Sequence, residues 1–241
     1  INSIIALFSS GQIQEALDSV RALIKDYPNE SVPYNISGAC YAALGQFDEA
    51  VKNYEKSLTI KPDYAEAHNN LAGTLQELGQ LDASIKSFEK AITIKPDYAE
   101  AFNNLCNVLK ELGQPDITVK SYKQVLTINP DLVEAHNNLG FTLQELGQLN
   151  AAVKSYEKAL AIRPNYAEAH NNLGNALYDL GQHDAAVKSY EKALAIKPDF
   201  ADTHNNLGIV LKELKQLDAA LKSYEKAIAI KPDHVEAHNN L

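Results

Sequence analysis

Pairs of adjacent asparagines are the residues whose type and spacing most clearly indicate binding chemistry. They stand in the hexapeptide EAHNNL, which occurs at residues 66–71, 134–139, 168–173 and 236–241, and in variants at 100–105 and 202–207. A primary amide both donates and accepts hydrogen bonds, so it can pair with the N–H and C=O groups of a peptide of any sequence. The repeated amides therefore indicate a surface that binds extended polypeptide.

Histidines precede most of these asparagine pairs, and their repetition raises the question of a metal site. Zinc needs ligand nitrogens about 2.0–2.1 Å from one ion, whereas equivalent residues on packed helices lie roughly 8–10 Å apart. We therefore expect packing or hydrogen-bonding roles for the histidines and no bound metal. The two cysteines, Cys40 and Cys106, form no disulfide or zinc pattern. The histidines concerned are His68, His136, His170, His204 and His238.

The rest of the sequence lacks the residue patterns of an enzyme. No set of nucleophile, base and orienting group recurs, and no glycine-rich phosphate loop is present, so we expect neither catalysis nor a cofactor in this segment. The formal net charge of −9 argues against nucleic acid, whose binding requires basic patches. No apolar run reaches membrane-spanning length and no signal-peptide pattern is present, so we expect a cytoplasmic protein without membrane contact.

The asparagine pairs belong to a longer repeat that sets the architecture. Seven prolines follow one another at intervals of 34 residues, and a fixed period of this length is typical of a solenoid of stacked units. Position 1 of each repeat is defined here as the third residue after such a proline, so that the next proline is position 32. The prolines are Pro28, Pro62, Pro96, Pro130, Pro164, Pro198 and Pro232.

Each repeat has the pattern of two helices, as residues 63–96 illustrate. Asp63 and Glu66 form a capping-box pattern in front of an apolar stripe at helical spacing. Gly79 is expected to end this first helix as a left-handed C-cap. A second helix follows, and Pro96 closes it. Neither helix can bury its apolar stripe alone, so each hairpin must stack on the next one.

Two repeats depart from this pattern between their helices. Lys215 stands where the other complete repeats have glycine, so we predict a left-handed residue that is strained by its side chain. Pro115 replaces a packing residue, and we expect it in the turn before a second helix, where a missing N–H is harmless.

A set of residues at fixed positions resembles the tetratricopeptide repeat family. The set comprises a small residue at position 8, glycine at 15, a small residue at 20, an aromatic at 24, alanine at 27 and proline at 32. The resemblance implies an all-α, right-handed superhelical solenoid of helix-turn-helix repeats over residues 1–241. A partial repeat at 1–30 and a truncated one at 235–241 flank six full repeats that start near residues 31, 65, 99, 133, 167 and 201. In one repeat the set is Gly174, Gly181, Ala186, Tyr190, Ala193 and Pro198.

The same resemblance implies where the asparagines lie. Positions 2, 5, 6, 9, 12 and 13 share one face of the first helix, and in the family this face lines a concave inner surface. Position 5 then forms a first row of asparagines along a groove, and position 6 forms a second row. The second row resembles the asparagine ladder in the repeat region of O-linked N-acetylglucosamine transferases. The first row is Asn69, Asn103, Asn137, Asn171 and Asn205; the second is Asn70, Asn104, Asn138, Asn172 and Asn206, with Asn240 in the truncated repeat.

A structural role is the alternative for these amides. One asparagine of each pair can bond to the neighbouring helix and order the stack instead of meeting a ligand, because amides inside repeat interfaces need hydrogen-bond partners. The sequence leaves both interpretations open.

Other side chains on the same face indicate the chemistry of the partner. Acidic residues at positions 2 and 13 outnumber the two lysines on the same face, Lys110 and Lys212, so we expect an extended partner that is neutral or basic. An exposed apolar cluster can anchor a partner side chain, and Phe141, Tyr178 and Ile209 occupy this face in consecutive repeats.

The leading interpretation is a scaffold that binds an extended peptide or protein segment in an acidic groove lined by asparagines. One alternative is the substrate-recruiting arm of a larger enzyme such as a glycosyltransferase, because the chain starts and stops within repeats. Another is a self-assembling structural protein. Both ends of the chain are expected to expose stacking surfaces, so we also predict end-to-end self-association.

Overall fold

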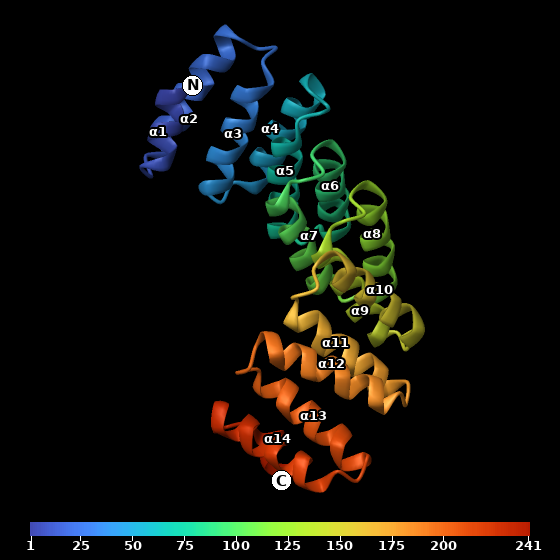
Figure 1. The fold of residues 1–241 in the computed structure, drawn as a ribbon. Coiled ribbons are helices and arrows are strands. Elements are labelled where there is room, and N and C mark those ends of the chain that lie inside the picture. Colours follow the sequence, from blue (N-terminus) through green and yellow to red (C-terminus); the bar gives the residue numbers. More distant parts are fainter. The chain divides into compact units, whose positions relative to one another are not determined.

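The computed structural model describes residues 1–241 and contains helices and turns but no strand (Figure 1). The all-α fold predicted from the periodicity is therefore confirmed, and every predicted helix pair is present. The helices are α1 (Asn2–Ser9), α2 (Ile13–Asp26), α3 (Ser31–Ala43), α4 (Phe47–Ile60), α5 (Ala65–Glu77), α6 (Leu81–Ile94), α7 (Ala99–Leu112), α8 (Pro115–Ile128), α9 (Val133–Glu145), α10 (Leu149–Ile162), α11 (Ala167–Asp179), α12 (His183–Ile196), α13 (Ala201–Glu213), α14 (Leu217–Ile230) and α15 (Val235–Asn240).

The start of the first helices differs from the prediction. The structure begins α5 at Ala65 with Tyr64 as its N-cap, and no side chain caps the helix. Asp63 instead lies in the short turn that joins α4 to α5, one residue before the N-cap, and its carboxylate makes no capping bond to the helix. The capping-box interpretation of Asp63 and Glu66 is wrong. Glu66 still lies in the first turn, where a negative charge is favoured by the helix dipole.

The turns inside the hairpins agree with the prediction. Gly79 has φ +70°, its N–H donates to the Gln76 carbonyl (2.8 Å), and the next N–H, of Gln80, donates to the Leu75 carbonyl (2.9 Å). This is the left-handed ending that glycine permits without strain. Lys215 adopts the same conformation with φ +60° and is the one non-glycine residue of the chain at positive φ. Pro115 is the first residue of α8, where no helical N–H is needed.

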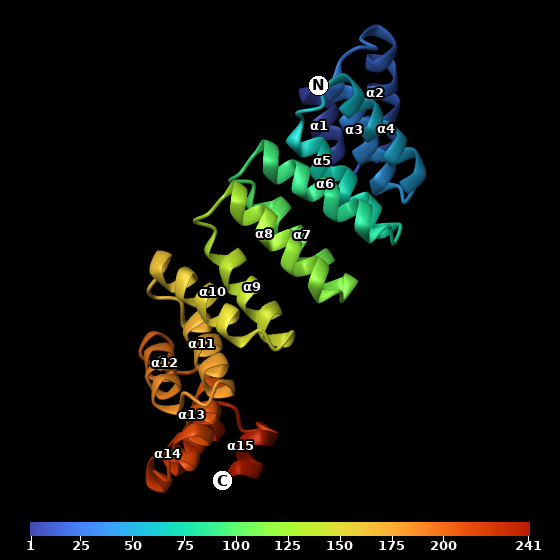
Figure 2. The same cartoon turned by 90° about the vertical axis from the view of Figure 1, so that its right-hand side faces the viewer.

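The chain forms two compact units, Ile1–Gln114 and Pro115–Leu241. Within each unit a first helix packs against the second helix of its own repeat, the second helix of the preceding repeat and, more weakly, the preceding first helix. In the second unit, Figure 2 shows α10, α12 and α14 along one side and the first helices α9, α11 and α13 along the other. One continuous solenoid over residues 1–241 stays a prediction.

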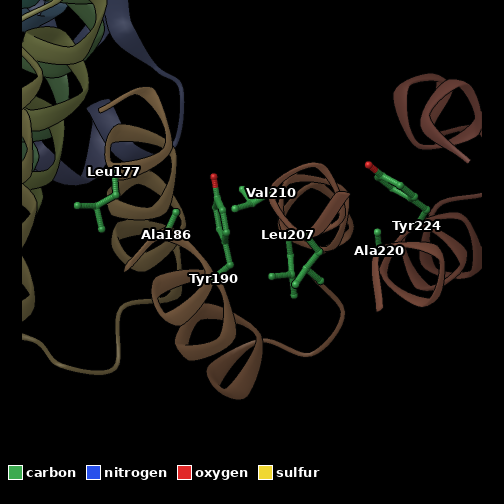
Figure 3. Close-up of a cluster of buried hydrophobic side chains, with 8 residues drawn as sticks. Leu177, Ala186, Tyr190, Leu207, Val210, Ala220 and Tyr224 are labelled. Carbon is green, nitrogen blue, oxygen red and sulfur yellow. The ribbon is translucent and has the colours of Figure 1, made fainter. Parts of the chain in front are cut away.

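Aromatic rings at position 24 set the rotation of the first helices. Tyr190 of α12 is 1% exposed and lies against Gly174 of α11, where a Cβ atom would come within 2.5 Å of the ring. Figure 3 shows this ring between Leu177 of α11 and Val210 of α13. With position 8 held against the ring, positions 6, 9 and 13 remain partly or fully exposed in every complete repeat. The same glycine–tyrosine contact occurs at Gly38 and Tyr54, Gly140 and Tyr156, and Gly208 and Tyr224.

Candidate functional site

The two asparagine rows differ in burial. Most of the first row is buried, with exposed fractions between 4% and 8% for Asn69, Asn137, Asn171 and Asn205, whereas Asn103 is exposed. Every member of the second row is half-buried. Position 5 therefore lies in the contact between successive first helices, and position 6 lies at the edge of that contact.

Hydrogen bonds connect the second row of one repeat to the first row of the preceding repeat. In each case the side-chain Nδ2 at position 6 donates to the Oδ1 at position 5 of the repeat before it, 35 residues earlier. The bonds are Asn70 to Asn35 (3.1 Å) and Asn104 to Asn69 (3.4 Å) in the first unit, and Asn172 to Asn137 (3.2 Å), Asn206 to Asn171 (3.4 Å) and Asn240 to Asn205 (3.0 Å) in the second.

This amide ladder provides hydrogen-bond partners for first-row amides inside the stack, which is the arrangement that the structural alternative requires. A structural role for this row stays a prediction. A buried amide that lost these partners would pay a desolvation cost. The second row is oriented by the ladder but is not enclosed by it, because its side chains remain half-exposed. Peptide binding by the second row stays a prediction.

A second set of bonds between repeats joins position 12 to the acid at position 13 of the next repeat. Gln76 donates to Glu111 (2.7 Å), Gln144 donates to Asp179 (2.7 Å), and the Tyr178 hydroxyl donates to Glu213 (2.6 Å). The bond to Glu213, with some burial, raises the pKa of Tyr178 to about 12, so this hydroxyl keeps its proton at neutral pH. The sequence predicted that these acids lie on this face but not which residues bond to them. The hydrogen-bond donors that recur at position 12 could have indicated these partners.

The acids at position 2 are partly neutralised at the rim of the face. Glu134 pairs with Arg163 (2.8 Å), and Glu66 and Glu168 lie 3.9 and 3.7 Å from lysines at the same repeat position. Each of these cations also sits over the aromatic ring three residues later, 4.7–5.2 Å from its centroid. Exposed pairs of this kind add little stability. Three of the six acids at position 2 thus have a lysine or arginine nearby, and at position 13 Glu213 lies 3.4 Å from His183.

The predicted apolar cluster is only partly assembled. Tyr178 and Ile209 line one pocket of about 220 Å³ on the first-helix face of the second unit. Phe141 is 52% exposed and does not line this pocket. The remaining lining residues, which sequence reasoning did not select, are Gln144, Asn175, Asp179, Tyr190 and the second-row Asn206.

The histidines at position 4 are engaged by the backbone. The Nε2–H of each donates to the carbonyl of the proline six residues earlier, at 2.8–3.0 Å. Burial lowers the pKa of His170 and His204 below the usual value. No group of three or more histidine, cysteine, aspartate or glutamate side chains is arranged to hold a metal ion.

None of the helices combines the length and the apolar character that crossing a membrane requires.

Known proteins with related sequences and structures support the repeat assignment. The TPR repeat family model matches residues 38–79, 74–113, 118–147, 143–181 and 174–215, and the tetratricopeptide repeat model matches residues 201–234. No curated protein sequence matches the chain.

Solved structures share the fold at low sequence identity. The C-terminal part of a TPR repeat-containing protein from Cytophaga hutchinsonii has a TM-score of 0.71 at 17% identity, covering 100% of this chain and 98% of its own. PilF of Pseudomonas aeruginosa has a TM-score of 0.58 at 20% identity, and the match covers 87% of this chain and 95% of PilF. The APC/C hetero-tetramer Cut9–Hcn1 has a TM-score of 0.57 at 20% identity. The match covers 99% of this chain but only 47% of the matched chain.

The structural matches show the fold alone, whereas the repeat models cover most of the sequence. Together with the 34-residue helix hairpins, the left-handed glycine turns and the position-24 aromatics, these matches establish that the chain belongs to the tetratricopeptide repeat family.

Proposed function

We propose that this chain is a protein-interaction scaffold whose first-helix face binds an extended peptide segment. The observation that carries the proposal is the row of half-exposed second-row amides, of which Asn70, Asn104, Asn172, Asn206 and Asn240 are held in place by a bond to the preceding repeat. Donors and acceptors that are already oriented lose little conformational entropy on binding.

The spacing of the row suits an extended chain. Packed helices lie roughly 8–10 Å apart, and an extended peptide advances about 3.3 Å per residue. Each repeat would therefore meet about one peptide unit in three. Because amides pair with backbone groups, this part of the binding would tolerate many sequences.

The charge of the face favours a neutral or basic partner. The acids at position 13 are all exposed, and the whole chain carries a formal charge of −9. Such a face attracts basic segments and repels acidic ones, chiefly through the association rate and in a salt-dependent way. The acids are Glu77, Glu111, Glu145, Asp179 and Glu213.

Backbone recognition can be tested with peptides selected by the 241-residue chain from a displayed random library. Each selected peptide would then be synthesised with single backbone N-methyl groups at successive positions, and its affinity measured by calorimetry. We expect affinity to fall most at about every third position, since one unit in three meets an amide. Affinities that are indifferent to N-methylation at every position would refute the proposal.

A variant of the protein gives the complementary test. Replacing Asn172 and Asn206 together by alanine should weaken every selected peptide, whereas replacing the exposed second-helix residues Glu191 and Glu225 by alanine should not. The asparagine variant also loses ladder bonds, so binding must be measured well below its melting temperature. Unchanged affinity in the folded asparagine variant would contradict the proposal.

A further inference from the structure

The pocket on the first-helix face of the second unit carries a more specific inference. Its walls come from α9, α11, α12 and α13, and its volume is about 220 Å³, room for about seven waters at ~30 Å³ each. It is therefore large enough for one polar side chain of a bound peptide. Its polar groups determine which one.

Asn175 presents only donors to the pocket. Its Oδ1 accepts hydrogen bonds from the Tyr190 hydroxyl (2.7 Å) and from the Nδ2 of Asn206 (3.1 Å), which occupies both lone pairs of a carbonyl oxygen. Its Nδ2 has no partner in the protein. Burial raises the pKa of Tyr190, so the hydroxyl stays protonated and holds the amide in this orientation.

Asn206 and Asp179 present only acceptors. The Nδ2 of Asn206 donates to both Asn171 (3.4 Å) and Asn175 (3.1 Å), which uses both of its N–H groups and leaves its Oδ1 without a partner. Asp179 accepts the Gln144 amide through Oδ2 (2.7 Å) and has its other oxygen unpaired. Ile209 supplies an apolar wall.

A ligand for this pocket must therefore accept a bond at Asn175 and donate bonds at Asn206 and Asp179. An ammonium or guanidinium group only donates and would face the N–H groups of Asn175. A carboxylate only accepts and would face the acid Asp179. An aliphatic side chain would leave all three groups unsatisfied, which is costly in a site built for hydrogen bonds. A primary amide has both functions.

We propose that this pocket, termed the amide pocket, takes the side-chain amide of a glutamine or asparagine of the bound peptide. The proposal extends the proposed function, because the same first-helix face would hold the peptide backbone. Most other complete repeats lack an amide at position 9, where they have Ala39, Gly73, Phe141 or Ile209. Asn107 is the one other asparagine at this position, and it is exposed, whereas Asn175 is half-buried and lines the pocket.

Small probes test the pocket without any peptide. The isotopically labelled full chain would be titrated with propionamide, propionate, propylammonium and N-methylacetamide while the side-chain amide resonances of Asn175 and Asn206 are followed by NMR. We expect saturable shifts with propionamide and not with the two ions. The absence of a saturable shift with propionamide would overturn the proposal. An equal response to N-methylacetamide would also overturn it, because the pocket would then recognise a backbone amide.

The variant Asn175→Asp reverses the chemistry of the pocket. Its carboxylate can still accept from Tyr190 and Asn206 but has no N–H to donate, so the probe preference should change from propionamide to propylammonium. Asn107→Asp, at the same repeat position and exposed on α7, is the matched control and should leave the preference unchanged. A preference for propionamide that survives Asn175→Asp would exclude the assigned role of Asn175.

Peptides separate failure of this inference from failure of the proposed function. For a selected peptide with glutamine at the pocket, replacement by glutamate, lysine or methionine should weaken binding about tenfold, a typical effect of one unsatisfied polar contact. Peptides that are sensitive to N-methylation but show no glutamine or asparagine preference would refute the amide pocket alone. Peptides indifferent to N-methylation would refute backbone binding, while the propionamide titration would still decide the pocket.

Discussion

The asparagines of the first helices show how one residue type serves two purposes at adjacent positions. At position 5 the amide is enclosed between helices and accepts a bond, whereas at position 6 it donates that bond and remains half-exposed. The two residues are neighbours in sequence but point about 100° apart around the helix. A single step along the chain thus separates an interior position from a surface one.

Lys215 is the residue with the clearest local strain. Its φ is +60°, and in the other complete repeats the residue with positive φ at this position is glycine. The left-handed region costs a residue with a side chain about 1–2 kcal/mol. Lys215→Gly should raise the free energy of unfolding by about 1 kcal/mol, partly offset by the greater freedom of glycine in the unfolded chain. Urea denaturation would measure it. Lys212→Gly, inside α13, should instead destabilise by about 1 kcal/mol, and a loss of stability in both variants would contradict the strain argument.

His170 and His204 should make stability depend on pH. Burial, with smaller contributions from Lys192 and Lys226, lowers the pKa of these histidines in the folded chain, and the Nδ1 of His170 is buried without a partner that could stabilise a second proton. The unfolded chain takes up protons near pH 6.5, before the folded chain does. The contribution of these histidines to the free energy of unfolding should therefore be fully present above about pH 6.5. It should decrease as the pH drops below this value and level off below the folded-state pKa.

The measurement is urea denaturation of the parent and of the double variant His170→Gln and His204→Gln between about pH 7.5 and pH 5. Glutamine can still donate to the proline carbonyl but does not titrate in this range. The variant should show the weaker pH dependence. Parallel stability profiles for the two proteins would contradict the assignment to these histidines.

At the scale of the element, the contact between position 8 and position 24 determines how each hairpin closes. A Cβ atom at Gly174 would lie 2.5–2.9 Å from atoms of the buried Tyr190 ring. Gly174→Ala should therefore lower the free energy of unfolding by about 1–3 kcal/mol. Gly73→Ala is the control, because a Cβ atom there meets nothing within 4 Å and alanine favours a helix by up to about 1 kcal/mol. Thermal unfolding of both variants should give shifts of opposite sign.

The amide ladder can be measured as a coupling between elements. Asn137→Ala leaves the Nδ2 of Asn172 without its acceptor, and Asn172→Ala leaves the buried Oδ1 of Asn137 without its donor. Each change should cost about 1–3 kcal/mol. The double variant should cost less than the sum, because neither partner is then left unsatisfied. Strictly additive effects in the double-mutant cycle would show that this bond does not stabilise the stack.

At the scale of the whole molecule, apolar side chains exposed on the first and last helices favour association. Leu221 of α14 and Val235, the first residue of α15, are 43% and 68% exposed, and Ile5 of α1 is 48% exposed. Covering such surfaces is favourable, so the 241-residue chain should self-associate through its ends. Sedimentation velocity over a range of concentration would detect this association. Leu221→Lys with Ile5→Lys should abolish it, whereas Lys222→Glu on the same helix should not; a monomer at all concentrations would contradict the prediction.

Much of the architecture could be predicted from the sequence because the signals are local. The proline period, the helical stripes and the glycine before each second helix depend on neighbouring residues, so they predicted the hairpins, the left-handed turns and the strained Lys215. The N-cap at Asp63 was wrong because a capping pattern does not determine where the preceding turn ends. A shift of one residue in that turn removes the carboxylate from the helix end.

The chain by itself determined the repeat, the hairpins and which residue types stand on the first-helix face. Only the tertiary structure decided what those residues do to one another. The bonds from Asn172 to Asn137 and from Gln144 to Asp179 join residues 35 positions apart, and they exist only because successive first helices pack side by side. Asn175 became part of a pocket for the same reason: its orientation depends on Tyr190 and Asn206, which arrive from two other helices. Periodicity reports the face on which a side chain lies, and the distance between two helices decides its partners.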